Sequence, residues 1–336
     1  MNTKKILTTA IYAIIMSSCM QNGKDRILPY VTDGEMSVSV KYDDAMTKST
    51  TDYITALDTE KSVKKIDVLV FDKSTGALNS VKSLNKIEDN CTFTLPTGEK
   101  TIYAIINGPD LSRITNISML ANLTDDLTKK DMTTSGLTLI GSTDCTVVKG
   151  VEAKPVIKVR WLVARVVLNK IICNIPAQYG MMQVDCVYLG NANMVQEFSG
   201  NTSVMVNPDG YEDNDKTKPI GQNTIIGSCP DYLYRQVNME IPTGGFSDTK
   251  FHMYCQPNQT DDYTCLFLMT SIGDSRYYYR VPLDLGLTAN STCSVELKIT
   301  NLGSPNPPVG NYESNTVTAN ISIEGWTAGN SYVAEF

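Results

Sequence analysis

Two segments, one near each end of the chain, alternate strictly between apolar and polar residues. This period of two predicts β-strands that bury one face and expose the other. In the first segment, residues 36–42, the apolar face consists of Met36, Val38, Val40 and Tyr42. In the second, residues 317–324, it consists of Val317, Ala319, Ile321 and Ile323. The chain therefore carries two similar half-buried strands, far apart in sequence.

Each of these strands lies beside a polar connector. Residues 302–316 (LGSPNPPVGNYESNT) are rich in Pro, Gly, Asn and Ser, which predicts an extended, solvated linker. Residues 43–62 are predicted as a mostly polar loop with Lys48 near its start, and Trp326 follows the second strand. A strand on a loose tether either packs into its own domain or completes the sheet of another molecule. Both outcomes stay open for residues 317–324.

The rest of the pattern predicts a mostly β, antiparallel chain of two tandem β-sandwiches with a minor helical element. Ser118 is expected to cap a helix that extends to Leu127, and the apolar run 154–173 to form one strand between the domains. We expect an N-terminal domain over 49–175, a C-terminal domain over 176–300, and a linker with C-terminal donor strands over 301–336.

The first 19 residues predict export. Lys4 and Lys5 precede a largely apolar stretch, residues 6–18, that is too short to span a bilayer and is typical of a signal peptide. It ends Met-Ser-Ser-Cys, which resembles a lipobox, so Cys19 is the predicted site of lipidation and membrane anchoring. An ordinary signal peptide with a chance cysteine is the alternative. Residues 20–48 are then a pro-segment that contains the first alternating strand.

Composition and charge exclude several classes of function. A net charge of −7 and a pI near 4.9 argue against a nucleic-acid partner. The nine cysteines include no CxxC pair, so neither a zinc site nor any other metal site is predicted. The eight that follow Cys19 permit disulfides in an exported chain, and their pairing stays open.

No feature of the sequence indicates an enzyme, a cofactor or a catalytic residue. The single histidine, His252, lies in a predicted strand and is interpreted as structural. The acidic segment 209–215 does not match the spacing of an EF-hand calcium loop, so it is interpreted as a solvated loop.

Several segments in this order resemble the fimbrillins of Bacteroidetes bacteria, the shaft subunits of type V pili. They are the lipobox at Cys19, the strand 36–42 with a basic residue in the loop behind it, VLVFDKSTGAL (68–78), GEKTIYAIIN (98–107), the predicted helix 118–127, VRWLVARVVL (159–168) and the tail from Leu297 to Trp326. The resemblance covers nearly the whole chain.

This resemblance implies a transthyretin-like fold for both sandwiches and a route of maturation. The precursor reaches the outer membrane as a lipoprotein, and a trypsin-like protease cuts in the loop after the first strand. The matching position is between Lys48 and Ser49; family members usually have Arg there, and Arg26 precedes the strand, so the site of cleavage stays open. The removable strand (Met36, Val38, Val40, Tyr42) leaves a groove for the donor strand of another subunit (Val317, Ala319, Ile321, Ile323, with Trp326).

The expected partners are other copies of the chain, accessory pilus subunits, the protease and possible host glycans or proteins. The expected location is the outer membrane and the cell-surface fimbria. The alternative is a surface lipoprotein that stays in the membrane, either as a pilus anchor subunit or as a glycan-binding β-sandwich protein.

Overall fold

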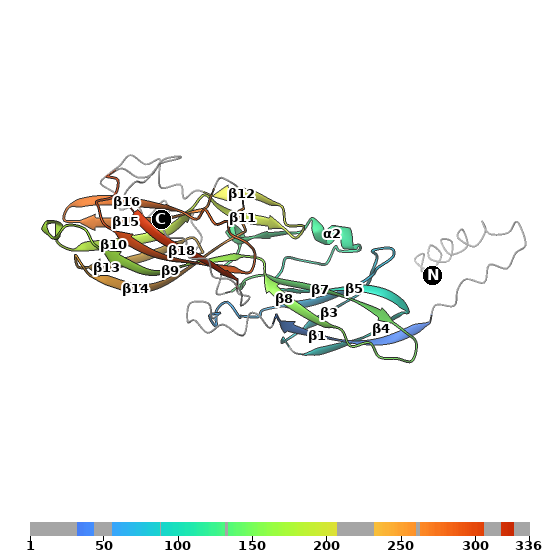
Figure 1. Cartoon of the computed structure of the whole chain (residues 1–336). Helices are drawn as coiled ribbons and strands as arrows, with labels where there is room; N and C mark the ends of the chain where they lie inside the picture. Colours follow the sequence, from blue (N-terminus) through green and yellow to red (C-terminus); the bar gives the residue numbers. More distant parts are fainter. Residues whose placement is uncertain are drawn as a thin grey trace, which may run out of the picture. The chain divides into compact units, whose positions relative to one another are not determined.

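The computed structural model describes residues 32–43, 56–87, 89–131, 134–206, 232–259, 263–305 and 317–325. In this part of the chain, β-strands build four sheets, and the helices are a short α2 (Ile117–Ala121) and the 3-10 turns η2 (Leu127–Lys129) and η3 (Ala177–Tyr179) (Figure 1). The predicted mostly β fold is confirmed. None of the helices described is long and apolar enough to cross a membrane.

The first sheet contains seven strands in the order β3-β2-β5-β7-β8-β1-β4. Their bounds are β1 Asp33–Tyr42, β2 Ile66–Asp72, β3 Leu78–Leu84, β4 Asn90–Pro96, β5 Gly98–Ile106, β7 Leu139–Val147 and β8 Val156–Trp161. Strands β7 and β8 pair only through Leu139–Trp161 and Ile140–Arg160. The sheet therefore divides into a four-stranded part, β3-β2-β5-β7, and a three-stranded part, β8-β1-β4. Both parts contribute buried side chains to one large core, and the other face of β2 and β5 packs in a second, smaller cluster.

The remaining strands form two four-stranded sheets and one three-stranded sheet, with the orders β13-β10-β15-β16, β14-β9-β17-β18 and β12-β11-β6. Their bounds are β6 Thr124–Asp126, β9 Ala164–Cys173, β10 Met182–Gly190, β11 Ala192–Glu197, β12 Thr202–Val206, β13 Tyr234–Ile241, β14 Phe246–Cys255, β15 Cys265–Ile272, β16 Ser275–Pro282, β17 Ser291–Ile299 and β18 Val317–Gly325. Buried side chains of these sheets belong to the same hydrophobic core as those of the first sheet. In sequence, the residues of this core extend from Met36 on β1 to Ile321 on β18.

The predicted strand over 154–173 is two strands. The chain leaves the first sheet at the end of β8, passes through Leu162 and Val163, and enters a different sheet as β9. The backbone of Leu162 donates to Thr138, and that of Asn290 donates to Val163, so the break is held from both sides. At the junction itself, Trp161, Leu162, Val163 and Ala164 are all apolar and buried, so the break leaves no sign in the hydrophobic pattern.

The predicted helix over 118–127 is shorter than expected. It begins after Asn116, whose side chain accepts a hydrogen bond from the backbone of Ser118, and it ends at Ala121. Residues 124–126 then form β6, which pairs with Val195–Glu197 of β11. Strand pairing with a distant segment thus overrides the local helical pattern.

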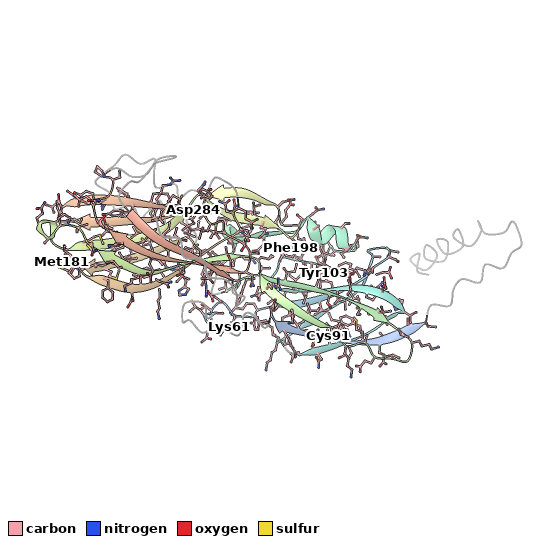
Figure 2. All side chains as sticks on the ribbon, in the orientation of Figure 1. Lys61, Cys91, Tyr103, Met181, Phe198 and Asp284 are labelled. Atoms are coloured by element: carbon pink, nitrogen blue, oxygen red, sulfur yellow. The ribbon has the colours of Figure 1, made fainter. Side chains whose placement is uncertain are left out.

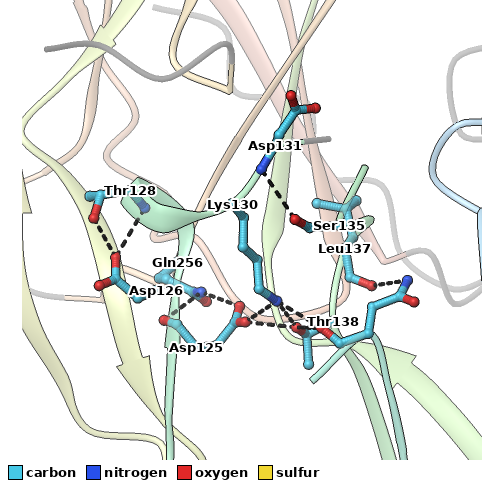
Figure 3. A network of polar contacts seen from close by, with 10 residues as sticks. Asp125, Asp126, Thr128, Lys130, Asp131, Ser135, Leu137, Thr138 and Gln256 are labelled. Atoms are coloured by element: carbon cyan, nitrogen blue, oxygen red, sulfur yellow. Dashed lines mark hydrogen bonds and ion pairs between the residues drawn. The ribbon is translucent and has the colours of Figure 1, made fainter. Parts of the chain in front are cut away.

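A polar network joins β6 to the residues that follow η2, precede β7 and follow β14 (Figure 3). The buried carboxylate of Asp125 accepts hydrogen bonds from Thr138 Oγ1 at 2.7 Å and from Gln256 Nε2 at 2.7 Å, and it pairs with the ammonium of Lys130. Lys130 also donates to the backbone carbonyl of Asn107 at 3.0 Å. These contacts connect the strands before residue 164 with those after it.

Candidate functional site

Strand β1 lies inside its sheet, with a hydrogen-bonded neighbour on each side (Figure 1). It runs antiparallel to β4, from the pair Asp33–Pro96 to the pair Ser39–Asn90. It runs parallel to β8, and the amides of Ser37 and Ser39 donate to Ala153 and Pro155 at 2.8 and 3.2 Å. Removal of β1 would therefore separate β4 from β8 and leave a slot lined by unpaired backbone groups.

The inner face of this slot is apolar. Met36, Val38 and Val40 have no exposed surface, and Tyr42 is half-buried against the same core. Cys91 on β4 is the partner of Val38 in the strand register (Figure 2), and Cys145 Sγ lies 3.4 Å from Met36 Sδ. Burial raises the pKa of both thiols. The predicted alternation of β1 is thus present in the structure, with its apolar side chains in the core.

The end of the slot where β1 begins is tight. A β-carbon added to Gly34 would lie 2.8 Å from Val147 Cγ1 and 2.8 Å from the backbone oxygen of Val148. Contacts this short would force the neighbouring atoms to move, and one of these atoms, the oxygen of Val148, belongs to the backbone. The slot therefore accepts a glycine at this position and resists any larger residue.

The other end is closed by aromatic and charged groups. The ring of Tyr42 stacks on Trp161 with 6.2 Å between centroids, and its hydroxyl donates to the backbone oxygen of Lys61 at 3.2 Å. Arg160 Nε lies 2.6 Å from the Asp43 carboxylate. Burial raises the pKa of Tyr42. The end of β1 thus contacts both β8 and the segment that follows the loop 44–55.

That segment is anchored by a fully buried ion pair. Glu60 and Arg165 have no exposed surface, and Arg165 Nη1 lies 2.9 and 3.0 Å from the two carboxylate oxygens. Tyr254 donates its hydroxyl to Glu60 at 2.5 Å, and the Trp161 indole donates to the Glu60 backbone oxygen at 3.2 Å. Burial, and then the negative charge of Glu60, hold the pKa of Tyr254 well above its usual value.

Strand β18 occupies an edge position. It is the last strand in the order β14-β9-β17-β18, where it pairs antiparallel with β17 from Ile299–Val317 to Ser291–Gly325. Ile321 is buried opposite Val295, and Ala319 is half-buried against the core. Within the described strands, β18 thus has one hydrogen-bonded neighbour, whereas β1 has two.

The remaining predicted site residues lie outside the described residues. These are the lipidation site Cys19, the two processing residues Lys48 and Ser49, the alternative cleavage residue Arg26, and Trp326 after the donor strand. Lipidation and processing therefore stay predictions. The structure describes the chain on either side of the predicted processing loop, up to Asp43 and from Ala56 onward.

Sequence reasoning missed Glu60, because it placed residues 43–62 in a polar loop. The available signal was Arg165, a charged residue inside an otherwise apolar run, which indicates a buried partner of opposite charge. The pattern does not say which carboxylate that partner is.

The described residues hold no group of three or more His, Cys, Asp or Glu side chains that is suited to a metal ion. His252 is half-buried in β14, and burial lowers its pKa. Cys91, Cys145, Cys173, Cys255 and Cys293 form no disulfide. The slot of β1 and the edge strand β18 are thus the features with a functional geometry.

Comparison with known proteins identifies relatives of this chain. A family model described as major fimbrial subunit protein (FimA) matches residues 35–218, more than half of the chain. Among curated proteins, a sequence comparison finds no match.

Solved structures share the fold at low sequence identity. A fimbrilin (FimA) from Porphyromonas gingivalis has a TM-score of 0.61 at 13% identity, and the match covers 88% of this chain and 98% of that one. A proposed cell adhesion protein from Parabacteroides distasonis has a TM-score of 0.62 at 16% identity, covering 88% and 97%. One from Bacteroides eggerthii has the same values.

Proposed function

The chain belongs to the family of major fimbrial subunit proteins (FimA), and from this premise we propose that it is a structural pilin that polymerises by strand exchange. It is exported as a lipoprotein precursor anchored through Cys19, cut between Lys48 and Ser49, and assembled into surface fimbriae that serve adhesion. Its two sandwiches, 49–175 and 176–300, are transthyretin-like. In this role the chain has no catalytic function.

The observation that carries the proposal is the position of β1. An interior strand whose apolar face is buried, completely at Met36, Val38 and Val40 and half at Tyr42, is followed at once by the loop that contains Lys48. A cut in that loop makes β1 a separate peptide whose only ties to the subunit are noncovalent. Its departure opens a slot that fits one alternating strand, and the chain carries a second such strand, β18, at the edge of its sheet among the strands described.

The energies of the two strands explain why a cut is needed. Each buried apolar side chain of β1 contributes about 1.5–3 kcal/mol as an upper estimate, and a donor strand with smaller side chains offers a similar or smaller gain. Before the cut, β1 is tethered at an effective concentration of roughly millimolar or more, so a donor from another copy loses the competition. Proteolysis removes this advantage and makes the exchange directional.

The proposal defines the partners. Other copies of the chain and accessory pilus subunits supply and receive donor strands, a trypsin-like protease cuts the precursor, and host glycans or proteins are the adhesion ligands. Until it is cut, the precursor is held at the outer membrane by its lipid. The occupied slot also hides two strand edges that would otherwise pair with other chains.

The test is the N-terminus and intact mass of the protein sheared from cells. We expect mature subunits that start at Ser49 in ladder-forming polymers, and the variant Lys48→Gln should accumulate as uncut precursor. Arg26→Gln is the matched control and should mature normally. A start at Ile27 with β1 retained would contradict strand exchange. A lipidated Cys19 start in membrane-bound monomers would instead favour the anchor or glycan-binding protein.

A further inference from the structure

The sequence of β18, read backwards, resembles that of β1 read forwards. From Gly34 to Tyr42, β1 is GEMSVSVKY, and from Gly325 back to Val317, β18 is GEISINATV. Glycine, glutamate and serine recur at the first, second and fourth positions. Apolar residues fill the four inward positions of both strands in this alignment: Met36 and Ile323, Val38 and Ile321, Val40 and Ala319, and Tyr42 and Val317.

From this correspondence we propose that β18 of one copy enters the slot of β1 in the direction opposite to β1, with Gly325 at the position of Gly34. The inference rests on the proposed strand exchange and adds its direction and register. In this arrangement, Ile323, Ile321 and Ala319 replace Met36, Val38 and Val40 in the core. The donor would lie parallel to β4 and antiparallel to β8, the reverse of the pairing that β1 makes.

The tight end of the slot favours this register. A β-carbon at the position of Gly34 meets Val147 Cγ1 and the Val148 backbone oxygen at 2.8 Å. If β18 entered in the direction of β1, the register that fills all four apolar positions would place Asn315 there, and a shift of two residues would place Val317 there. The reversed register places a glycine there, the residue that fits without moving the wall.

The hydrogen bonds of the slot permit the reversal. In β1, the residues whose side chains face outward, such as Ser37 and Ser39, point their backbone groups toward β8. Consider a strand that is rotated by half a turn about an axis perpendicular to the sheet. Its apolar side chains still face inward, but the backbone groups that pointed toward one neighbouring strand now point toward the other. Outward-facing donor residues then bond to β4 and inward-facing ones to β8, so both ladders are completed.

The direction also determines where the C-terminal tail leaves the slot. In the reversed arrangement, the residues after Gly325, which begin with Trp326 and end with Phe336, emerge beside the Gly34 position. Val148, whose backbone forms part of the wall there, and its bridge partner Val151 are 50% and 61% exposed. Aromatic residues of the tail would thus emerge beside exposed valines, which they can cover.

Disulfide trapping between copies tests the direction. Thr92 on β4 is exposed and lies opposite Ser37 of β1. A cysteine in place of Thr92 can therefore form a disulfide with a cysteine at the donor residue that takes the position of Ser37. Full-length Thr92→Cys precursor is mixed with an equal amount of Ser322→Cys, Asn320→Cys or Thr318→Cys precursor, cut with trypsin, and oxidised under mild conditions. The readout is the cross-linked pair on a non-reducing gel, with its site identified by mass spectrometry. Thr92→Cys alone and the uncut mixtures are the controls.

The reversed register predicts a cross-link to Ser322→Cys after the cut. Predominant cross-linking to Thr318→Cys, or to Asn320→Cys, would contradict the reversed register with Gly325 at the position of Gly34 and overturn the inference while leaving the proposed function intact. Polymers without any of the three cross-links would overturn the inference, because the donor would lie elsewhere. If cut protein forms no polymer and no cross-link, strand exchange itself is wrong.

A second variant tests the role of Gly325 without new cysteines. Gly325→Val should fold like the parent, since it changes the last residue of an edge strand, but it should lower the yield of polymer by roughly tenfold or more, the effect of an overpacked site. Gly310→Val in the linker is the matched control and should polymerise normally. An unchanged yield for Gly325→Val would argue against the reversed register.

Discussion

At the scale of single residues, Glu60 connects several polar and aromatic groups near the end of β1. Its carboxylate accepts hydrogen bonds from Arg165 and Tyr254, and its backbone oxygen accepts one from Trp161, against which Tyr42 stacks. Because Arg165 is fully buried, loss of the Glu60 carboxylate would leave a positive charge without its partner in the core. Arg165 also donates to Thr292 on β17, the strand that pairs with β18.

The variant Glu60→Ala should lower the free energy of unfolding of the precursor by about 3–5 kcal/mol, the cost of breaking a buried pair from one side. Urea unfolding followed by circular dichroism measures this loss as a lower midpoint. Asp58→Ala is the matched control, since Asp58 is exposed and its partner Lys61 lies 3.8 Å away; exposed pairs contribute about 1 kcal/mol or less. Equal midpoints for the two variants would contradict the importance of the buried pair.

At the scale of elements, β1 and β18 differ in their surroundings more than in their sequences. Strand β1 has β4 and β8 on its two sides, whereas β18 has β17 on one side among the strands described. Release of β1 therefore breaks its pairing with two neighbours, whereas release of β18 breaks its pairing with one described neighbour. The proposed strand exchange uses this difference, because it needs a slot that stays filled until the cut and a donor strand that leaves a sheet edge.

Departure of β1 should be visible at Cys91. Cys91 lies on β4 beside Val38 of β1 and is 7% exposed, and burial raises the pKa of its thiol. A maleimide should therefore label it slowly in the precursor. After the cut and the loss of β1, labelling should accelerate by an order of magnitude or more, as measured by mass spectrometry of peptides. The rate should fall again once a donor strand fills the slot.

Cys255 and Cys293 provide internal controls for this experiment. Both are fully buried in β14 and β17, and burial raises the pKa of Cys255 to about 12. They should stay unlabelled throughout. Labelling of all three thiols at one rate would indicate general unfolding, and no change at Cys91 would mean that β1 stays in place after the cut.

At the scale of the whole molecule, the strands before and after residue 164 share one core and are joined by the Asp125 network (Figure 3). Asp125 accepts from Thr138 on one side and from Gln256 on the other. The predicted boundary near residue 175 lies after β9, although β9 pairs with β14 and β17, so the chain before and after the boundary shares a sheet. We infer that the two proposed sandwiches unfold together, because unfolding of either one would expose buried groups of the other that pack in the shared core.

Thermal or urea unfolding of the precursor should therefore show a single transition that is the same by tryptophan fluorescence and by circular dichroism. Asp125→Ala should lower stability by about 3–5 kcal/mol, since it leaves the largely buried Lys130 ammonium without its carboxylate. Asp126→Ala, the neighbouring control, removes the cap of η2 and should cost about 1 kcal/mol. Two separate transitions in the parent protein would contradict a shared core.

The amino-acid sequence by itself determined that the chain is mostly β and where its two alternating strands lie. This was possible because the period of two is a local property: Met36, Val38 and Val40 face one side of any strand that they form. The position of Arg165 in an apolar run was a further signal, for a buried charge, that the predictions did not use.

Only the tertiary structure decided that β1 lies between β4 and β8, that Glu60 is the partner of Arg165, and that the helix after Asn116 stops at Ala121. Each of these features depends on contacts between residues far apart in the chain, such as Met36 with Phe93 or Asp125 with Gln256. A local pattern contains no information about such partners, because their free energy is gained only when the distant segments meet. The slot is therefore a property of the fold, and the strands suited to fill it are a property of the sequence.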